Sequence, residues 1–491
     1  MKTLVIESIS SKPHLETAAE IIFRIKEKKN NKIKFAWIGS QLPWNDWSFT
    51  KLYNFFGISH EKRIKSFIKF LINNNIDCIY ENNLPVNISF IERWGNRFNG
   101  NIKDLRGYRY KNFSLGEGVA SSLISFFKNE NLNLKKIIKL TRKTLISSAI
   151  ILERTRSIIL NEKPNKIITF NGRFSISHPI VLAAKKAKIQ ILFHERGSSL
   201  YKFEIFKDNI HNQSFRAKEI IRYWRLNGKN KKKIGHKYFI KRRNRENIES
   251  DIGYSYAKNQ KENYINFKHL KKKRIIVFYT STDYEYAAGH RDYGQEKYFK
   301  KFLLVVKKFN DIHIIIRIHP GRNERNIIED QKWNKYASNG VTVINSDDKT
   351  DSYKLMDIAD IVVTYSSRII IEAAYWGKNT ISLSNKQFYS RFKIAICTHN
   401  SKLLKKILKH NYIFKKVNKE DCIKIGYYFE NFGIKYKYYK PINYFDGKFI
   451  NNTFEWKFKL IVILELIGTK RIYKYIKNKI KYYFISFYLK K

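Results

Sequence analysis

Short apolar runs alternate with amphipathic stretches along most of this chain, and the alternation predicts an α/β fold. Near the N-terminus we expect strands over Lys2–Ser8 and Lys32–Ile38, on either side of an amphipathic helix over Pro13–Lys28. A second series opens with the apolar run Arg274–Tyr279. Strands that alternate with helices form parallel sheets covered by helices, so both halves of the chain are expected to contain Rossmann-like βαβ units.

The segment Asp351–Leu383 has the most regular pattern in the chain. A short helix over Asp351–Met356 precedes a β-branched strand at Ile361–Thr364, and a helix over Ile369–Tyr375 then leads to a strand at Thr380–Leu383. Small hydroxyl residues stand between the first strand and its helix, which is typical of a turn. Because a helix start presents free N–H groups and a partial positive charge, this turn suits a phosphate.

Five residues near two strand ends form the predicted donor-binding set. Ser366 and Ser367 occupy the hydroxyl turn, and Glu372 lies one to two turns into the helix, where a carboxylate can reach ribose hydroxyls. Arg317 and His319 end another apolar strand, and both can carry positive charge toward a phosphate. The structural alternatives are an ion-paired strand end for the cations, helix caps for the serines and a surface carboxylate for Glu372.

The first half of the chain also places polar groups at the carboxyl ends of strands. We expect strands over Lys166–Phe170 and Gln190–Phe193, each followed by polar residues. In open α/β sheets ligands bind at this edge. The predicted acceptor-side residues are Asn171, Arg173, His194 and Arg196, and Glu195 is a candidate acid or base.

Two other patterns allow a functional and a structural interpretation. Gly116 and Gly118 precede a helix, where they either cradle an acceptor phosphate or permit close helix packing. The aromatic residues between Trp44 and Phe56 either stack on sugar rings or form core.

Several motifs together resemble a known family. The sequences IRIHP, ending at Pro320, and ADIVVTYSSRIIIEAAYWGKNTISL, ending at Leu383, resemble the C-terminal half of bacterial capsular polysaccharide biosynthesis glycosyltransferases. These are GT-B proteins related to the Kdo transferases of capsule export, and the glycerophosphotransferases of teichoic acid synthesis carry a looser version. The resemblance extends over roughly Leu105 to Leu383 and includes the motifs FNGR, HERG and YTSTDYE.

The resemblance implies two Rossmann-like domains that face each other across a cleft. The acceptor would bind the first domain and a nucleotide sugar the second. A catalytic carboxylate is implied after the first strand of the second domain, where this sequence offers both Asp283 and Glu285 and does not decide between them. Glu195, across the cleft, is then the candidate acid or base for the acceptor hydroxyl.

The domain boundaries are placed by changes in composition along the chain. Lys-rich polar sequence without strong periodicity precedes the apolar strand at Arg274. We expect an acceptor domain at 1–257, a linker at 258–272, a donor domain at 273–400, helices that cross back to the first domain at 401–453, and a basic amphipathic tail at 454–491.

Charge and cysteine content narrow the class of protein. The chain of 491 residues has 96 Lys and Arg against 42 Asp and Glu, a formal net charge of +54. This excess favours anionic substrates and surfaces, although the abundance of Lys, Asn, Ile and Tyr also fits a compositional bias without function. The three cysteines are far apart and odd in number, which fits a reducing cytoplasm.

The membrane is expected as a surface partner only. The N-terminus is too short and too polar for a signal peptide, and no apolar run is long enough to span a bilayer. The tail Phe454–Lys491 alternates cations with aromatic and aliphatic residues, so it either lies on anionic lipid or packs as a final helix. The predicted location is the cytoplasmic face of the cell membrane.

The function that fits these patterns is a glycosyltransferase of surface polysaccharide synthesis, acting on a glycan or glycolipid acceptor. No DxD motif stands where it would hold a metal, so neither a metal nor another cofactor is predicted, and the nucleotide sugar, with CMP-linked donors among the candidates, is a substrate. One alternative is a CDP-polyol phosphotransferase of teichoic acid type. Another is a non-catalytic polyanion-binding protein, although nucleic acid is not the expected partner.

Overall fold

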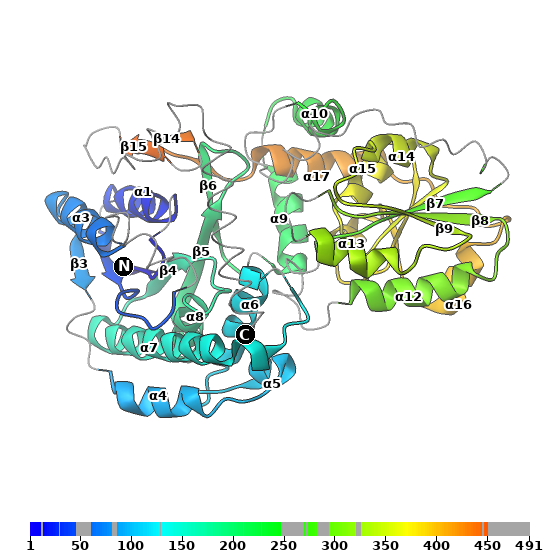
Figure 1. The fold of residues 1–491 in the computed structure, drawn as a ribbon. Coiled ribbons are helices and arrows are strands. Elements are labelled where there is room, and N and C mark those ends of the chain that lie inside the picture. Colours follow the sequence, from blue (N-terminus) through cyan, green and yellow to red (C-terminus); the bar gives the residue numbers. More distant parts are fainter. Residues whose placement is uncertain are drawn as a thin grey trace, which may run out of the picture. The chain divides into compact units, whose positions relative to one another are not determined.

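The computed structural model describes residues 1–10, 13–28, 30–45, 60–80, 86–127, 129–209, 211–226, 228–246, 270, 273–282, 294–320, 326–443 and 446–449. The chain divides into two compact units, shown in Figure 1. Unit 1 comprises Met1–Asn209 and Gly433–Lys491, and unit 2 comprises Ile210–Phe432. Each unit is built around one sheet with helices on both faces, so the predicted α/β class with two Rossmann-like units is confirmed.

The sheet of unit 1 has the order β13-β6-β5-β4-β1-β2-β3. Its parallel strands are β1 (Lys2–Glu7), β2 (Lys32–Trp37), β3 (Asp77–Tyr80), β4 (Lys166–Phe170) and β5 (Gln190–Arg196). Two antiparallel strands complete one edge, namely β6 (Lys202–Phe206) and β13 (Ile434–Lys435). Along β1, Leu4 and Ile6 belong to one core cluster and Val5 belongs to another. Hydrophobic side chains therefore pack on both faces of the sheet.

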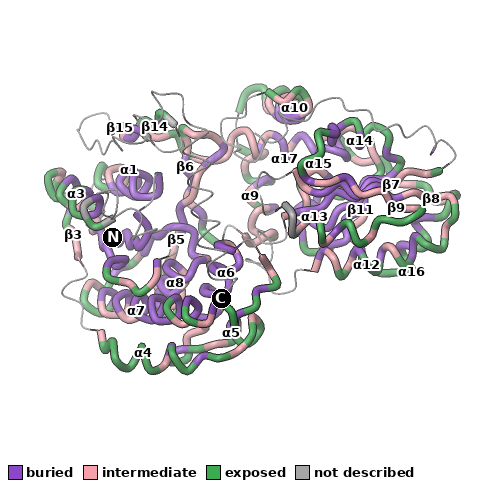
Figure 2. The backbone as a smooth tube through the Cα atoms, viewed as in Figure 1, coloured by how far each residue is buried: buried purple, intermediate pink, exposed green. Residues whose placement is uncertain are grey.

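Helices cover both faces of this sheet. One face carries α1 (His14–Lys26) and α3 (His60–Asn73). The other carries α7 (Ile138–Glu162) and α8 (His178–Lys186), with α4 (Ile88–Asn96), α5 (Ile102–Gly107) and α6 (Leu115–Phe127) packed around them. Figure 2 shows that burial is concentrated in the strands and in the helix faces turned toward them.

Close packing explains the two glycines of α6. A Cβ atom on Gly116 would lie 1.6 Å from the Leu105 carbonyl oxygen, and one on Gly118 would lie 2.7 Å from Cβ of His178. Real Cβ atoms do not approach other atoms so closely, so both positions require glycine for helix packing. Close helix packing, the structural interpretation of these two glycines, therefore accounts for the motif.

The chain returns to unit 1 at its C-terminal end through strands. β13 pairs with β6, and β14 (Tyr439–Asn443) forms a hairpin with β15 (Asp446–Phe449). The buried Glu20 carboxylate of α1 accepts the backbone N–H groups of Lys437, Tyr438 and Tyr439 at 2.7, 2.7 and 3.0 Å. A carboxylate that receives three N–H donors is well compensated for burial, so Glu20 attaches the returning segment to α1.

The sheet of unit 2 has six parallel strands in the order β12-β11-β10-β7-β8-β9. The strands are β7 (Arg274–Tyr279), β8 (Ile312–Arg317), β9 (Val341–Ile344), β10 (Ile361–Thr364), β11 (Asn379–Ser382) and β12 (Ile396–Cys397). Counted from its own first strand and read from the β9 edge, this order is 3-2-1-4-5-6, the doubly wound arrangement of dinucleotide-binding folds.

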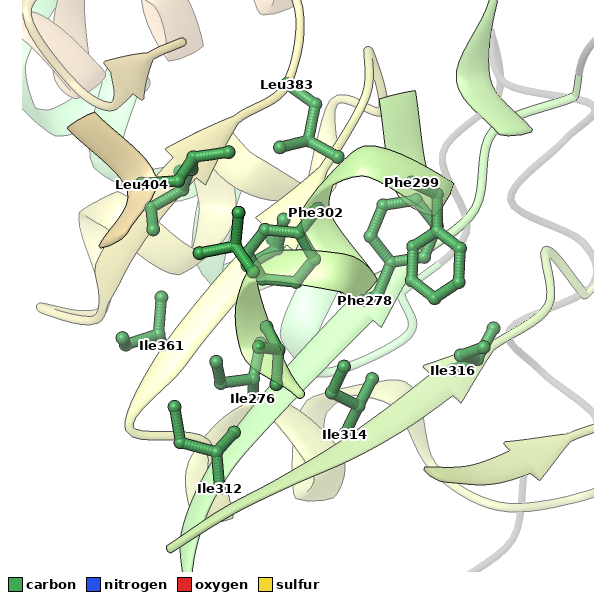
Figure 3. Packing of buried hydrophobic residues seen from close by; sticks show 14 of the residues in the cluster. Ile276, Phe278, Phe299, Phe302, Ile312, Ile314, Ile316, Ile361, Leu383 and Leu404 are labelled. Carbon is green, nitrogen blue, oxygen red and sulfur yellow. The ribbon is translucent and has the colours of Figure 1, made fainter. Parts of the chain in front are cut away.

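Apolar layers on both faces hold the sheet of unit 2. α12 (Gln295–Val306), α13 (Asn326–Asn334) and α16 (Ser401–Ile407) cover one face, and α14 (Ser352–Ile358) and α15 (Ile369–Tyr375) cover the other. Figure 3 shows Phe299 and Phe302 of α12 beside Phe278 of β7, whose ring centroid lies 4.6 Å from that of Phe299. A third cluster joins α9 (Gln213–Arg225), α10 (Lys231–Arg243) and α17 (Lys419–Asn431) to α15.

The boundary between the units differs from the predicted one. Residues 210–246 were expected in the first domain, but α9 and α10 belong to unit 2. The reason is aromatic packing, because Phe239 of α10 stacks on Tyr375 of α15 at a centroid distance of 3.9 Å. The helices α16 and α17 also belong to unit 2, and strands make the return to unit 1. Apart from Leu270, the predicted linker lies outside the described residues, as does the predicted tail.

Candidate functional site

The strand order of unit 2 reverses next to β7. β8 and β9 follow on one side of β7, whereas β10, β11 and β12 lie on the other. Ligands of doubly wound sheets bind at such a switch point, outside the carboxyl ends of the strands. The residues that follow β7 and β10 therefore define the candidate site of this unit.

Two serine hydroxyls meet at this point. Ser281 follows β7, Ser366 follows β10, and their Oγ atoms lie 3.3 Å apart. Both residues are almost fully buried, at 3% and 1% exposure. Gln295, the first residue of α12, holds Ser281 by accepting its N–H at 2.7 Å and donating to its carbonyl at 3.1 Å. This double contact brings the N-terminus of α12 to the same edge.

The other predicted residues of the hydroxyl turn and of β8 lie on neighbouring strand ends. The backbone N–H of His319 donates to Thr280 Oγ1 at 2.8 Å, which ties the end of β8 to the end of β7. The N–H of Ser367 donates to Thr364 Oγ1 at 3.0 Å, so the threonine shapes the turn before α15. The structure thus brings Ser366 and Ser367 to one edge with the backbone of His319.

Arg317 has a structural task in unit 2. Its guanidinium is only 1% exposed and donates to the carbonyl oxygens of Asn345, Asp348 and Thr350. These carbonyls belong to the loop that follows β9. In this structure the guanidinium of Arg317 is directed at the loop, and a contact with a donor phosphate stays a prediction. Burial lowers the pKa of Arg317, against the opposing effect of Asp348.

Glu372 also faces protein groups. It is 6% exposed, it accepts a hydrogen bond from the Tyr353 hydroxyl, and its Oε1 atom lies 4.0 Å from a guanidinium nitrogen of the buried Arg242. A carboxylate needs such partners to remain charged when buried. Glu372 therefore links α15 to α14 and α10 in this structure, and the ribose contact stays a prediction.

Among the described residues that follow β7 and β10, Ser281 and Ser366 contribute neutral hydrogen-bonding groups at this edge. Serine hydroxyls donate and accept hydrogen bonds, and the backbone N–H groups at the start of α12 add a partial positive charge. This combination suits phosphate oxygens. Ser281 and Gln295 were not predicted as site residues, although the hydroxyl run after the strand at Arg274–Tyr279 carried a signal for the first of them.

Unit 1 has its own switch point, between β1 and β4, where the order of the parallel strands reverses. Asn171 follows β4 with a φ of 55°, a left-handed conformation that Asn adopts more readily than most residues. Its side-chain amide donates to Glu195 Oε2 at 2.8 Å, and the N–H of Arg196 donates to Glu195 Oε1 at 3.1 Å. Glu195 is half-buried, so a fixed carboxylate is presented at this edge.

A second acid lies beneath the same edge. Glu7, the last residue of β1, has its Oε1 atom 2.6 Å from Nε2 of His194 on β5. Both residues are at most 1% exposed. Burial raises the pKa of Glu7, and His194 opposes this effect through its charge and hydrogen bond. Glu7 was missed from the sequence, where it stands at the end of an ordinary apolar strand.

Of two further polar side chains in unit 1, Arg173 was predicted as a site residue and His14 was not. Arg173 is half-buried, with its guanidinium carbon 4.5 Å from the ring centroid of Phe174. His14, at the start of α1, lies 3.9 Å from the Phe170 ring, and burial, with Arg196 adding to it, lowers the pKa of its imidazole well below the usual value. The predicted catalytic acids Asp283 and Glu285 lie outside the described residues.

The described part of the chain lacks two features. Within it, no three side chains of His, Cys, Asp or Glu are grouped as metal ligands. Among the described helices, none combines the length and apolar character needed to cross a bilayer.

Comparison with known proteins places a family similarity within unit 2. Residues 250–410 match the family of UDP-N-acetylglucosamine 2-epimerases, and this segment lies between the limits of unit 2, Ile210–Phe432. It amounts to less than half of the chain. No curated protein matches the sequence.

Solved structures of two enzyme types are similar to the chain. The beta Kdo 2,4 transferase KpsC of Thermosulfurimonas dismutans is 12% identical, with 54% of this chain and 80% of that chain covered and a TM-score of 0.38. The beta Kdo 2,7 transferase of the same KpsC is 12% identical, covers 55% and 79%, and has a TM-score of 0.33. The UDP-GlcNAc 2-epimerase of Methanocaldococcus jannaschii, in complex with UDP-GlcNAc and UDP, is 15% identical, covers 87% and 98%, and has a TM-score of 0.30.

Proposed function

We propose that this protein is a glycosyltransferase of surface polysaccharide synthesis, with GT-B-like units, that moves a sugar from a nucleotide-activated donor to a glycan or glycolipid acceptor. Unit 2 binds the donor and unit 1 carries the acceptor chemistry. The observation that supports this most is the meeting of Ser281 and Ser366 at the switch point of a 3-2-1-4-5-6 sheet. Nucleotides bind doubly wound sheets at this place.

The donor nucleotide is held by neutral groups in this proposal. The hydroxyls of Ser281 and Ser366 and the first N–H groups of α12 receive phosphate oxygens, and closeness to a helix start favours their negative charge. The family match over residues 250–410 supports UDP as the nucleotide, because the matched family is named for a UDP-sugar. CMP-linked donors, suggested by the resemblance to Kdo transferases, are the other donors to test.

Acid–base chemistry on the acceptor is assigned to Glu195. Its carboxylate has both oxygens hydrogen-bonded, by the Asn171 amide and the Arg196 N–H, and so keeps one orientation. A fixed carboxylate can take the proton of an acceptor hydroxyl as that oxygen attacks the sugar. Asp283 and Glu285 remain the candidates for the carboxylate that supports the anomeric carbon, as the family resemblance implies.

Location and cofactors are part of the same proposal. The protein acts on the cytoplasmic side of the membrane, with its basic C-terminal tail against anionic lipid, because cations that alternate with apolar residues bind such surfaces. The nucleotide sugar is a substrate, and the reaction uses no resident metal. Turnover that persists in the presence of a chelator would support this last point.

A second candidate function is epimerisation of a UDP-sugar, which the family match over residues 250–410 favours. The two functions differ in one requirement, because an epimerase needs no acceptor. UDP-N-acetylglucosamine and a CMP-linked sugar should be incubated with the protein, with and without a glycolipid acceptor, and followed by NMR. Transfer that depends on the acceptor supports the glycosyltransferase, whereas a new UDP-sugar formed without acceptor supports the epimerase.

A further inference from the structure

The sheet of unit 1 opens at its carboxyl edge. β1 pairs with β4 from Thr3 to Val5, whereas its pairing with β2 continues to Glu7. On the other side, the pairing of β4 with β5 continues to His194. The strands on the two sides of the switch point therefore separate just where the switch-point crevice of a doubly wound sheet begins.

Glu7 and His194 connect the two separated sides. Glu7 ends the β1–β2 half, His194 belongs to the β4–β5 half, and their side chains meet at 2.6 Å. Nδ1 of His194 has no hydrogen-bond partner among the described residues. The contact with Glu7 is therefore the one side-chain hydrogen bond of His194 among the described residues.

Charged and titratable groups surround this pair on several elements. His14 of α1 is buried beside it, and Arg63 of α3 and Arg196 of β5 act electrostatically on His14 together with His194. Arg63 is itself paired with Glu16 at 2.6 Å. Buried ionisable groups lower stability unless they are well paired, and their concentration at a switch point is typical of a functional site.

The pair is connected to Glu195 through the backbone and through Asn171. The carbonyl oxygen of His194 accepts the N–H of Asn171 at 3.2 Å, and the side chain of Asn171 donates to Glu195. Glu195 is also the next residue along β5. Glu7 and His194 are hydrogen-bonded to each other, whereas Glu195 is half-buried at the edge, so the influence of the pair on catalysis is expected to pass through Glu195.

We propose that Glu7 is a positioning residue of the acceptor site, which fixes His194 and thereby the ends of β4 and β5 that present Glu195. This inference rests on the proposed function only for its catalytic consequence. The positioning itself is a property of unit 1, and it can be measured without a substrate. Two experiments therefore separate failure of the inference from failure of the proposed function.

The first experiment follows the Glu195 carboxyl group by ¹³C NMR in protein labelled at Glu, with Glu195→Gln providing the assignment. We expect Glu7→Gln to change the ¹³C chemical shift of the Glu195 carboxyl group at a fixed, neutral pH, because a loosened Asn171 amide changes the hydrogen bonding of that carboxyl. Glu7→Asp should lie between wild type and Glu7→Gln. Glu162→Gln is the control, since Glu162 is an ion-paired carboxylate of unit 1 that contacts Lys2 at the other end of β1, and it should leave the shift unchanged.

The second experiment compares steady-state kinetics of the same variants, with nucleotide affinity as the check that unit 2 is folded. We expect Glu7→Gln to lower kcat at least tenfold, with the donor KM within twofold of wild type and the acid limb of the pH profile shifted. An unchanged Glu195 carboxyl signal in Glu7→Gln overturns the positioning role. Equal loss of kcat in Glu7→Gln and Glu162→Gln, with one common pH profile, also overturns it. A changed Glu195 signal in a protein without transferase activity supports the positioning and contradicts the proposed function alone.

Discussion

The carboxyl edges of the two sheets occupy equivalent places in two similar units, yet they carry different chemistry. At the edge of unit 2 the neutral hydroxyls of Ser281 and Ser366 meet, and the charges of Arg317 and Glu372 are directed at other parts of the protein. The described residues at the edge of unit 1 include two acids, with Glu195 half-buried and Glu7 beneath it.

The difference indicates a division of labour. Neutral donors and helix N–H groups can hold a phosphate without changing their protonation, whereas a carboxylate can exchange a proton with an acceptor. A charged strand end in the sequence is therefore not evidence of ligand contact by itself. Arg317 and Glu195 both follow apolar strand residues, but only the second is presented at its edge.

The largest expected effect is on unit 1. Glu195→Gln should lower transfer by about 10²–10⁴-fold, the range that general acid–base catalysis contributes, because the amide cannot accept the acceptor proton. Nucleotide affinity should remain as in wild type, since the donor is assigned to unit 2. Rate measurements at saturating donor, paired with calorimetric nucleotide titrations, test both parts. Full turnover in this variant would place the acid–base group elsewhere.

The next effect concerns the stability of unit 2. Arg317→Ala removes the donors of three backbone carbonyls and should lower the free energy of unfolding by about 1–3 kcal/mol, the cost of leaving buried polar groups unsatisfied. Chemical denaturation is the measurement, and Arg317→Lys, which keeps the charge but not the planar fork, is the control. If Arg317→Ala has the stability of wild type but binds the nucleotide more weakly, Arg317 contacts the donor instead of stabilising the loop.

A smaller effect is expected for single serines. Ser366→Ala and Ser281→Ala should each weaken nucleotide binding about tenfold, because one net hydrogen bond contributes about 0.5–1.5 kcal/mol and bonds to charged groups about 1.5–3. Ser390→Ala, a hydroxyl bound to the Gln387 carbonyl at 2.7 Å in the same unit, serves as the control. Calorimetry with UDP, CDP, CMP and GDP gives the affinities. An equal loss of nucleotide affinity in all three variants would show that the two serines at the switch point have no specific role in binding.

The smallest effect is a dependence of stability on pH. Burial alone would raise the pKa of Glu296, but hydrogen bonds from Lys335 and Tyr336 lower it to about 2. A carboxyl with a lowered pKa in the folded state contributes stability above its unfolded pKa, and this contribution is lost as pH falls through about 2. The difference in stability between wild type and Glu296→Gln should therefore shrink from pH 6 to pH 2. Glu7, whose pKa is raised, has the opposite sign and contributes less as pH rises.

The sequence predicted the repeating framework well, for a physical reason. Apolar runs such as Lys166–Phe170, Arg274–Tyr279 and Ile361–Thr364 are largely buried parallel strands with the predicted bounds, because a strand covered on both faces must be mostly apolar. The short strand β6 and the helix α10 were not predicted. β6 lies between β5 and the two-residue strand β13 and has Glu204 in its centre, and α10 is basic with little periodicity, so only tertiary contacts define them.

The candidate site was predictable in position but not in detail. Chain order shows that Ser366 and Glu195 follow strands, yet it does not show which way a long side chain turns. Arg317 turns to a loop about 30 residues further along the chain, and Glu7 meets a histidine 187 residues away. Both contacts depend on strand order, which local sequence does not specify.

The central claim is that the switch point of unit 2 binds the donor nucleotide while unit 1 supplies the acid–base group. The most direct measurement is nucleotide affinity in the double variant Ser281→Ala/Ser366→Ala, compared with Glu195→Gln and wild type. We predict that UDP or another nucleotide of the panel binds wild type and Glu195→Gln equally, and binds the double variant at least 30-fold more weakly, because two hydrogen bonds to charged oxygens are lost. Equal affinity in the double variant and wild type, or a loss of affinity in Glu195→Gln, would contradict the account.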